Sequence, residues 1–251
     1  MTGPLAGQVA FVAGASRGIG AAIAVALSEA GAAVAVAART DTESRVPGTI
    51  HTVADAINAD GGTALPVICD VTDEESVTTA TDRVARELGG IDIAVANAGV
   101  LWLGPVETTP QKRWQLCLDV NLTGTFLVTK HVIGHLRARG GGSLIAVTTT
   151  GVGMIERGSN AYWVSKAAVE RLYLGLAHDL RGDDIAVNCL SPSRVVLTEG
   201  WQAAGGGREI PPEMVEPPET MGRAAVRPAA QRSDGISGTV QRSEQLVAHT
   251  T

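Results

Sequence analysis

The sequence predicts an α/β protein built on one doubly wound parallel sheet, with helices on both of its faces. Short apolar runs alternate with amphipathic stretches along the chain, and no repeat or linker interrupts the alternation. A glycine-rich turn joins the first apolar run to the first amphipathic one. The 251 residues lie near the upper size for one hydrophobic core, so we expect a single domain over residues 1–251.

The apolar runs are the expected strands. Runs of this length, bounded by turn residues, fit strands buried on both faces of a sheet, and the amphipathic stretches between them supply the crossovers that parallel strands need. In chain order they are QVAFVAG (8–14), AAVAVAA (32–38), TALPVICD (63–70), IDIAVANAG (91–99), SLIAVTTT (143–150) and IAVNCLSP (185–192), with a last short strand within 237–246.

Punctuating residues mark the helices. Pro47 is expected to open one helix, Asp73 to cap the helix over 74–89, and Pro110 to stand near the start of a long helix that ends at RARGGG. A further helix is expected over 213–230. The Gly- and Pro-rich segment 193–217 is too long for a simple connection, so we expect it to be a lid over the functional site.

Composition favours a small-molecule partner. The formal net charge is −6 and the basic residues are scattered, which argues against binding to nucleic acid or to an anionic membrane. The apolar stretch 21–38 is interrupted by Ser28, Glu29 and Gly31, so it predicts a helix, a turn and a strand rather than a membrane span. The N-terminus has no basic leader, and a cytoplasmic location is expected. The three cysteines lack paired spacing and are expected to be buried thiols: Cys69, Cys117 and Cys189.

Gly14, Gly18 and Gly20 lie in the turn after the first strand and at the start of the next helix. Glycines there let backbone amides close on a pyrophosphate at the positive end of the helix, so the pattern favours dinucleotide binding. The alternative is a tight turn with a purely structural role.

The glycine spacing resembles that of the short-chain dehydrogenase/reductase family, in its main branch of about 250 residues, a size in line with a single domain. The resemblance extends to CDV after the third strand, ANAG after the fourth, Asn121 in LDVNLTG, the pair Tyr162 and Lys166, and VNCLSPS. VPGTIHT and GGTALPV also resemble hydroxysteroid-dehydrogenase-like members, more weakly. The resemblance implies a Rossmann fold, an NAD(P)-dependent oxidoreductase acting on CH–OH groups, no metal, and a homotetramer.

Cofactor residues follow from this resemblance, position by position. Asp70 would accept from the adenine amino group, Asn97 with Gly99 would line the adenosine side, and Val195 with Thr198 would face the nicotinamide carboxamide. Asp70 capping a turn and Asn97 holding two strands together are the structural alternatives. The implied set is Gly14, Ser16, Arg17, Gly18, Ile19, Gly20, Arg39, Asp70, Val71, Asn97, Ala98, Gly99, Tyr162, Lys166, Pro192, Val195 and Thr198.

The end of the second strand bears on which dinucleotide is bound. Ala38 stands where an NAD enzyme would place an acid for the ribose hydroxyls. Arg39 follows, and Arg17 lies in the glycine turn, so the two guanidinium groups are expected to converge on a 2′-phosphate. NADP(H) is therefore the expected cofactor, with NAD(H) possible. Two solvated surface arginines are the alternative.

Tyr162 and Lys166 are four residues apart, hence on one face of the helix expected to begin near Asn160. A nearby ammonium and the cationic nicotinamide ring both favour a phenolate, so Lys166 is expected to lower the pKa of Tyr162, the expected general acid/base. The resemblance adds that Lys166 grips the nicotinamide ribose and that Asn121 holds a water that relays protons to it. The structural alternatives are an interfacial tyrosine with a solvated lysine, and a surface asparagine. Thr149 lies thirteen residues before Tyr162, where the family places a serine.

Four positions depart from the family pattern: Ala13, Ala96, Thr149 and Ser193, the last standing where glycine follows the proline. His131 and His135 share metal-ligand spacing, but no third ligand is evident, so a packed or hydrogen-bonded pair is expected. The apolar wall of the substrate site is expected from Trp102, Met154, Ile155, Trp163, Trp201 and Met214.

We therefore expect hydride transfer between NADP(H) and a secondary alcohol or ketone, with an apolar substrate. Asn121, Thr149, Tyr162 and Lys166 are the expected catalytic residues. A dinucleotide-binding regulator or scaffold without turnover is the main alternative, because fold does not imply function. A sugar-nucleotide epimerase or dehydratase is disfavoured by the glycine spacing and the short C-terminal region.

Overall fold

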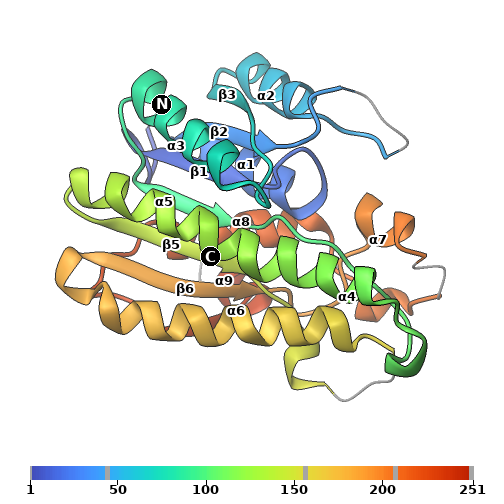
Figure 1. Cartoon of the computed structure of the whole chain (residues 1–251). Coiled ribbons are helices and arrows are strands. Elements are labelled where there is room, and N and C mark those ends of the chain that lie inside the picture. The colour runs from blue at the N-terminus through green and yellow to red at the C-terminus, as the bar shows by residue number, and fades with distance from the viewer. Residues whose placement is uncertain (1, 43–45, 155–157, 206–208, 249–251) are drawn as a thin grey trace.

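The computed structural model describes residues 2–42, 46–154, 158–205 and 209–248. Within these residues the chain forms one seven-stranded sheet (Figure 1). Every strand pair in it is parallel, and the strand order is β3-β2-β1-β4-β5-β6-β7. The strands are β1 (Val9–Ala13), β2 (Ala33–Ala38), β3 (Thr63–Ile68), β4 (Ile93–Ala96), β5 (Gly142–Val147), β6 (Ile185–Ser191) and β7 (Thr239–Arg242). The predicted fold class is confirmed.

The strand order reverses beside β1. The chain moves outward from β1 through β2 to β3, and then returns to place β4 against the other edge of β1. At such a point the loops that follow the two central strands leave in opposite directions and open a crevice at the carboxyl ends of the strands. The loops after β1 and β4 therefore face a common crevice.

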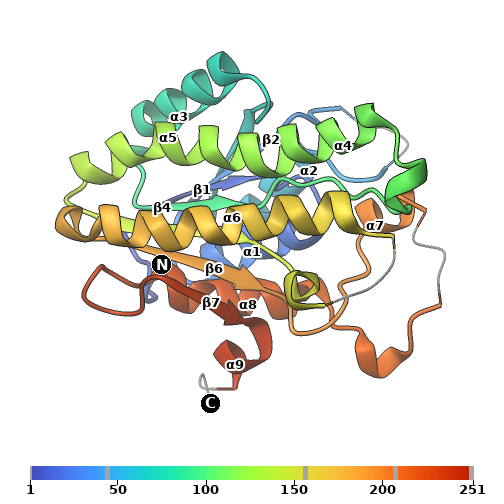
Figure 2. The ribbon, with the colours of Figure 1, turned by 60° about the horizontal axis from the view of Figure 1, so that its bottom comes forward.

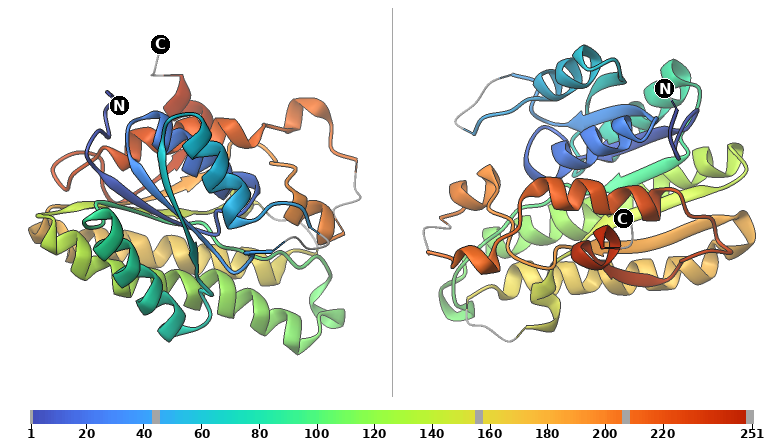
Figure 3. Two further views of the ribbon diagram at one scale, coloured as in Figure 1. Left: turned by 90° about the horizontal axis from the view of Figure 1, so that it is seen from above. Right: turned by 180° about the vertical axis from the view of Figure 1, so that it is seen from behind.

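Helices cover both faces of the sheet because its central strands are apolar on both sides. On one face pack α3 (Glu74–Leu88), α5 (Gly124–Ala138) and α6 (Asn160–Asp179), around a core that includes Phe11 and Tyr173. On the other face pack α1 (Gly18–Glu29), α2 (Ile50–Ala59) and α8 (Pro218–Ala229), around a core that includes Ile23 and Met221. The rear view in Figure 3 shows this second layer.

Shorter elements complete the described chain. They are α4 (Gln111–Cys117), the π-helical turn η2 (Leu118–Thr123), α7 (Glu199–Ala203), α9 (Ser243–Val247) and four short 3-10 turns, η1 (Val106–Thr108), η3 (Thr150–Gly153), η4 (Arg181–Asp183) and η5 (Pro212–Met214). Figure 2 shows α9 below β7, and α7 beyond the ends of the central strands.

Some predicted helix limits are wrong. The second helix begins at Ile50 rather than at Pro47, because Thr49 and Thr52 form a reciprocal capping box there. The helix predicted over 213–230 is two elements, η5 and α8, separated by residues 215–217. Asp73 caps α3 as predicted, by accepting from Glu75 N. In the described residues no helix is both long enough and apolar enough to cross a membrane.

Candidate active site

A cavity of about 700 Å³ opens at the carboxyl ends of the strands. Its lining combines the glycine turn, the ends of β2 to β5, the first two turns of α6, and described residues of segment 193–217, the expected lid segment. Of the predicted cofactor residues, every one except Gly20 lines it, and so do three of the four predicted catalytic residues: Thr149, Tyr162 and Lys166. Gly20 and Asn121 do not line the cavity. The fold thus brings predicted site residues from Gly14 to Thr198, which are far apart in the sequence, around one cavity.

Two glycines of the turn pack so closely against neighbouring protein atoms that a side chain would collide with them. Gly14 has φ +77°, and a Cβ added there would lie 2.6 Å from Ala98 Cα. A Cβ on Gly20 would collide with the carbonyl oxygen of Gly14 and the amide of Asn97. No side chain of the described residues caps α1, so its first amides stay available to an anion.

Asn97 and Asp70 also make the structural contacts that were considered as alternatives to cofactor binding. Asn97 Nδ2 donates to Gly14 O at 2.9 Å, which ties the loop after β4 to the glycine turn. Asp70 Oδ1 accepts from the amide and the hydroxyl of Thr72. Burial opposes ionisation of Asp70, but these hydrogen bonds and the charge of Arg39 hold its pKa below the usual value. Both side chains still line the cavity.

The two arginines differ in their surroundings. Arg17 Nε donates to Pro47 O at 2.8 Å, and its Nη2 donates to Gly48 O at 2.6 Å. Arg17 therefore holds the loop after β2 against the glycine turn. The Arg39 side chain is 64% exposed, and its Nη1 lies 3.9 Å from Asp70 Oδ2. The sequence did not point to the partners of Arg17; the turn residues Pro47 and Gly48 were the available signal.

Tyr162 and Lys166 lie on one face of α6, which begins at Asn160 as predicted. Lys166 is 3% exposed; its Nζ donates to Val147 O at 2.8 Å and lies 6.0 Å from the centroid of the Tyr162 ring. Burial lowers the pKa of Lys166 to about 8, against smaller opposing effects of Cys189 and Glu170. Burial also raises the pKa of Tyr162 to about 12, with a smaller contribution from Cys117.

In the polypeptide by itself, burial of the phenol is the main influence on Tyr162, and its pKa lies above the usual value. The ammonium of Lys166 donates to a main-chain oxygen, and burial lowers its own pKa. A lowering of the Tyr162 pKa by Lys166 together with the nicotinamide ring stays a prediction for the chain with its cofactor.

Asn121 lies in the π-helical turn η2 and is fully buried. Its Oδ1 accepts from Val100 N at 2.8 Å, and its Nδ2 donates to Val100 O at 3.0 Å and to Ser165 Oγ at 2.9 Å. The side chain thus joins the loop after β4 to α6, close to Lys166. Because both ends of the amide have protein partners, the side chain has little capacity left to hold a water.

The three threonines all line the cavity but differ in environment. Thr149 Oγ1 accepts from Gly151 N at 3.2 Å, which leaves the hydroxyl proton free to donate. Thr148 is 3% exposed, and its Oγ1 has no hydrogen bond of standard geometry among the described residues. Thr150 begins the 3-10 turn η3.

The wall away from the glycine turn is largely apolar. Of the residues predicted for it, Met154, Trp163, Trp201 and Met214 line the cavity. Trp102 does not; the guanidinium of Arg113 lies 4.9 Å from its ring centroid. Ile155 lies outside the described residues. The prediction missed four apolar neighbours in loops, where periodicity gives no signal: Leu101, Leu103, Val196 and Ile210. It also missed Leu116 on α4.

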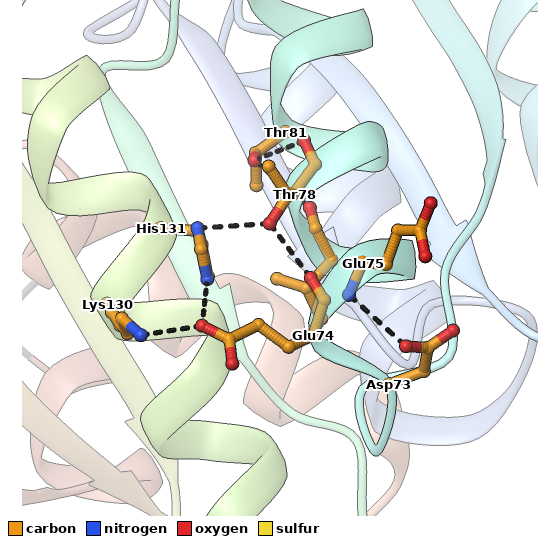
Figure 4. A network of polar contacts seen from close by, with 8 residues as sticks. Asp73, Glu74, Glu75, Thr78, Thr81, Lys130 and His131 are labelled. Carbon is orange, nitrogen blue, oxygen red and sulfur yellow. Dashed lines mark hydrogen bonds and ion pairs between the residues drawn. The ribbon is translucent and has the colours of Figure 1, made fainter.

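Each of the two histidines lies close to an acid on α3, and Figure 4 shows the contacts of His131. His131 Nε2 lies 3.0 Å from Glu74 Oε1, which also accepts from Lys130 Nζ at 2.6 Å. His135 Nε2 lies 3.3 Å from Asp82 Oδ1. No cluster of metal-ligating side chains occurs among the described residues. Cys69, Cys117 and Cys189 are buried and unpaired, as predicted.

The chain is similar in sequence and fold to known proteins. The family model for short chain dehydrogenases matches residues 8–207. Hydroxysteroid dehydrogenase-like protein 2 of Danio rerio is 40% identical over 208 residues, covering 82% of this chain and 50% of that protein. The chain thus spans about half the length of such curated relatives.

Two solved structures are similar over nearly the whole fold. A short-chain dehydrogenase/reductase from Mycobacterium marinum is 33% identical with a TM-score of 0.86, covering 95% of this chain and 94% of that one. A Beutenbergia cavernae dehydrogenase, solved with NADP at low occupancy, is 31% identical with a TM-score of 0.85, covering 97% and 98%. The chain therefore belongs to the short-chain dehydrogenase family of NAD(P)-dependent oxidoreductases.

Proposed function

We propose that the chain transfers a hydride between NADP(H) and the oxygen-bearing carbon of a secondary alcohol or ketone with an apolar body. One observation carries the proposal: the Tyr162–Lys166 face of α6 and Thr149 line the same cavity as the glycine turn. A dinucleotide in the turn and a carbonyl near the tyrosine would thus share one space. The apolar side chains of Trp163, Trp201 and Met214 support an apolar substrate.

The residues present fit a dinucleotide. Residues of the glycine turn line the cavity, and the first turn of α1 has no side-chain cap among the described residues, so its amides can bind a pyrophosphate. Gly14, Ser16, Gly18 and Ile19 would hold the pyrophosphate, and Asp70, Val71 and Asn97 to Gly99 the adenosine. Pro192, Val195 and Thr198 would border the nicotinamide, which when bound supplies or accepts the hydride.

The preference for NADP(H) rests on the end of β2. Ala38 is 8% exposed and offers no carboxylate, while the side chain of Arg39 next to it is 64% exposed and can pair with a 2′-phosphate. Among the described residues, the bonds of Arg17 to the loop carbonyls use its Nε and one N–H of Nη2, so its other N–H groups can add to this pairing.

Tyr162 would hold and move the proton at the substrate oxygen. Its raised pKa keeps the phenol protonated and able to donate. Thr149, whose own proton is free, would donate a second hydrogen bond to that oxygen and so stabilise developing alkoxide charge. Lys166 would hold the nicotinamide ribose hydroxyls, and Asn121 would fix the position of α6 through Ser165.

A screen of ketones and secondary alcohols with NADPH, NADH and their oxidised forms, followed by nicotinamide absorbance, tests the proposal. Turnover by the unmodified chain that is lost in Tyr162→Phe is expected. Tight dinucleotide binding with no turnover on a broad carbonyl panel would favour the regulator alternative instead.

Assembly as a homotetramer is also proposed. Phe126 on α5 and Val164 and Leu174 on α6 are between 42% and 46% exposed, and they support burial of these long helices between subunits. Light scattering coupled to gel filtration would give the mass of the assembly, and a monomer would refute the proposal.

A further inference from the structure

Glu216 is a buried carboxylate at the base of the lid segment 193–217. It is 3% exposed, and among the described residues no lysine, arginine or histidine forms an ion pair with it; the nearby Arg194 pairs with Glu244 instead. A buried carboxylate without a cation is unfavourable unless hydrogen bonds compensate it. The groups that provide those bonds therefore show what Glu216 holds in place.

Two donors from distant parts of the chain reach this carboxylate. Ser193 N, just after β6, donates to Glu216 Oε1 at 2.9 Å. Ser243 Oγ, at the start of α9, lies 2.9 Å from Oε1 and 2.8 Å from Oε2, so its single proton is shared between the two oxygens. Ser243 is fully buried. Glu216 thus joins the first residue of the lid segment to the C-terminal helix.

Ser193 adds a second bond to the C-terminal helix. Its Oγ accepts from Glu244 N at 3.1 Å, and Arg194 Nη2 lies 2.8 Å from Glu244 Oε1. A glycine, the residue usual at position 193 in this family, could not provide the Oγ contact. The serine therefore strengthens the same connection that Glu216 makes.

The lid segment is closed at its base by main-chain bonds on either side of this cluster. Val195 N donates to Met214 O at 2.8 Å, and Glu216 N donates to Val195 O at 3.0 Å. Pro192, Arg194 and Val195 line the cavity beside this base. The position of Glu216 is therefore coupled to the wall that would border the nicotinamide.

We propose that Glu216 is a positioning residue that, with Ser193 and Ser243, holds residues 192–196 where the nicotinamide end of the cofactor needs them. The affinity for the nicotinamide half then depends on the C-terminal helix, which itself does not line the cavity. This inference rests on the proposed function.

The test compares Glu216→Ala and Ser243→Ala with the unmodified chain. The matched control is Glu213→Ala, which removes an exposed glutamate of the same segment. Two ligands are titrated: NADPH, and adenosine 2′,5′-bisphosphate, which lacks the pyrophosphate-linked nicotinamide half. Melting temperatures, and KM and kcat with NADPH, are measured on each protein.

We expect Glu216→Ala to raise the Kd and KM for NADPH about tenfold, and Ser243→Ala to raise them about threefold. Binding of the bisphosphate, the kcat at saturating NADPH, and all properties of Glu213→Ala should stay within about twofold of the unmodified chain. If Glu216 has a purely structural role, Glu216→Ala should lower the melting temperature and either weaken the binding of both ligands equally or leave both affinities unchanged. Either result would overturn the inference.

If Glu216→Ala fails to fold, Ser243→Ala and Ser193→Gly decide the question, because each removes one hydroxyl and leaves the carboxylate in place. NADPH affinity unchanged in both would contradict the inference while leaving the proposed function intact. An unmodified chain that binds no dinucleotide would overturn the proposed function, and this inference with it.

Discussion

The ammonium of Lys166 donates to the carbonyl oxygen of Val147 at 2.8 Å. Val147 is the last residue of β5, and the three threonines follow it directly. This bond fixes the first turns of α6 against the end of the strand, so that Tyr162 and Thr149 both reach the cavity. It also gives the buried ammonium of Lys166 a main-chain partner.

Replacement of Tyr162 by phenylalanine removes one hydroxyl and keeps the ring that packs against the cavity. We expect NADPH to bind with unchanged affinity and turnover to fall by at least ~10³, equivalent to about 4 kcal/mol in the barrier. Steady-state rates and a cofactor titration on the same samples measure both effects. Retention of more than a few per cent of the rate would mean that another group handles the proton.

The threonines can be separated by three alanine variants. Thr149→Ala should lose about 10²–10³ in rate, because it removes a donor to the developing alkoxide. Thr149→Ser should keep most activity, and Thr148→Ala and Thr150→Ala should be mild. NADPH binding should persist in all four. A larger loss at Thr148 or Thr150 would show that the wrong hydroxyl has been assigned.

Cofactor preference should respond to the end of β2. Ala38→Asp combined with Arg39→Ser should shift selectivity from NADP to NAD by a few kcal/mol, since a carboxylate repels a 2′-phosphate and accepts from ribose hydroxyls. The ratio of kcat/KM for the two cofactors measures the shift. Equal affinity of the unmodified chain for NAD and NADP would refute the role of Arg39.

The buried ammonium of Lys166 should make stability depend on pH. Its pKa is about 8 in the folded chain, against the ordinary lysine value of 10.5, which we take for the unfolded chain. Between these values the unfolded chain binds a proton that the folded chain does not, so the free energy of unfolding rises with pH, by up to about 3 kcal/mol over the full interval. The gain is lost as the pH falls through about 8.

Lys166→Met is the comparison that isolates this effect, because other titrating groups are common to both proteins. Urea unfolding from pH 7 to pH 10 should show the stability of the unmodified chain rising relative to the variant. If the free energies of unfolding of the two proteins change in parallel over that pH range, burial does not disfavour the charged form of Lys166 in the folded chain.

The sequence by itself was enough to predict the strands, the order in which they alternate with helices, and the residues at their carboxyl ends. These depend on local patterns: apolar runs, caps such as Asp73, and the spacing of Gly14, Gly18 and Gly20. The four-residue interval between Tyr162 and Lys166 likewise determines that they share a helix face. Local hydrogen bonding and periodicity are properties of residues that are neighbours in the sequence, so the sequence alone is sufficient to predict them.

Only the tertiary structure decided which distant groups meet. Arg17 bonds to the carbonyls of Pro47 and Gly48, and Glu216 receives donors from Ser193 and Ser243. The rise in the pKa of Tyr162 follows from burial that no local pattern encodes. These contacts join residues 23 to 31 positions apart and depend on how the elements pack, and desolvation depends on everything that surrounds a group. Both are properties of the folded whole.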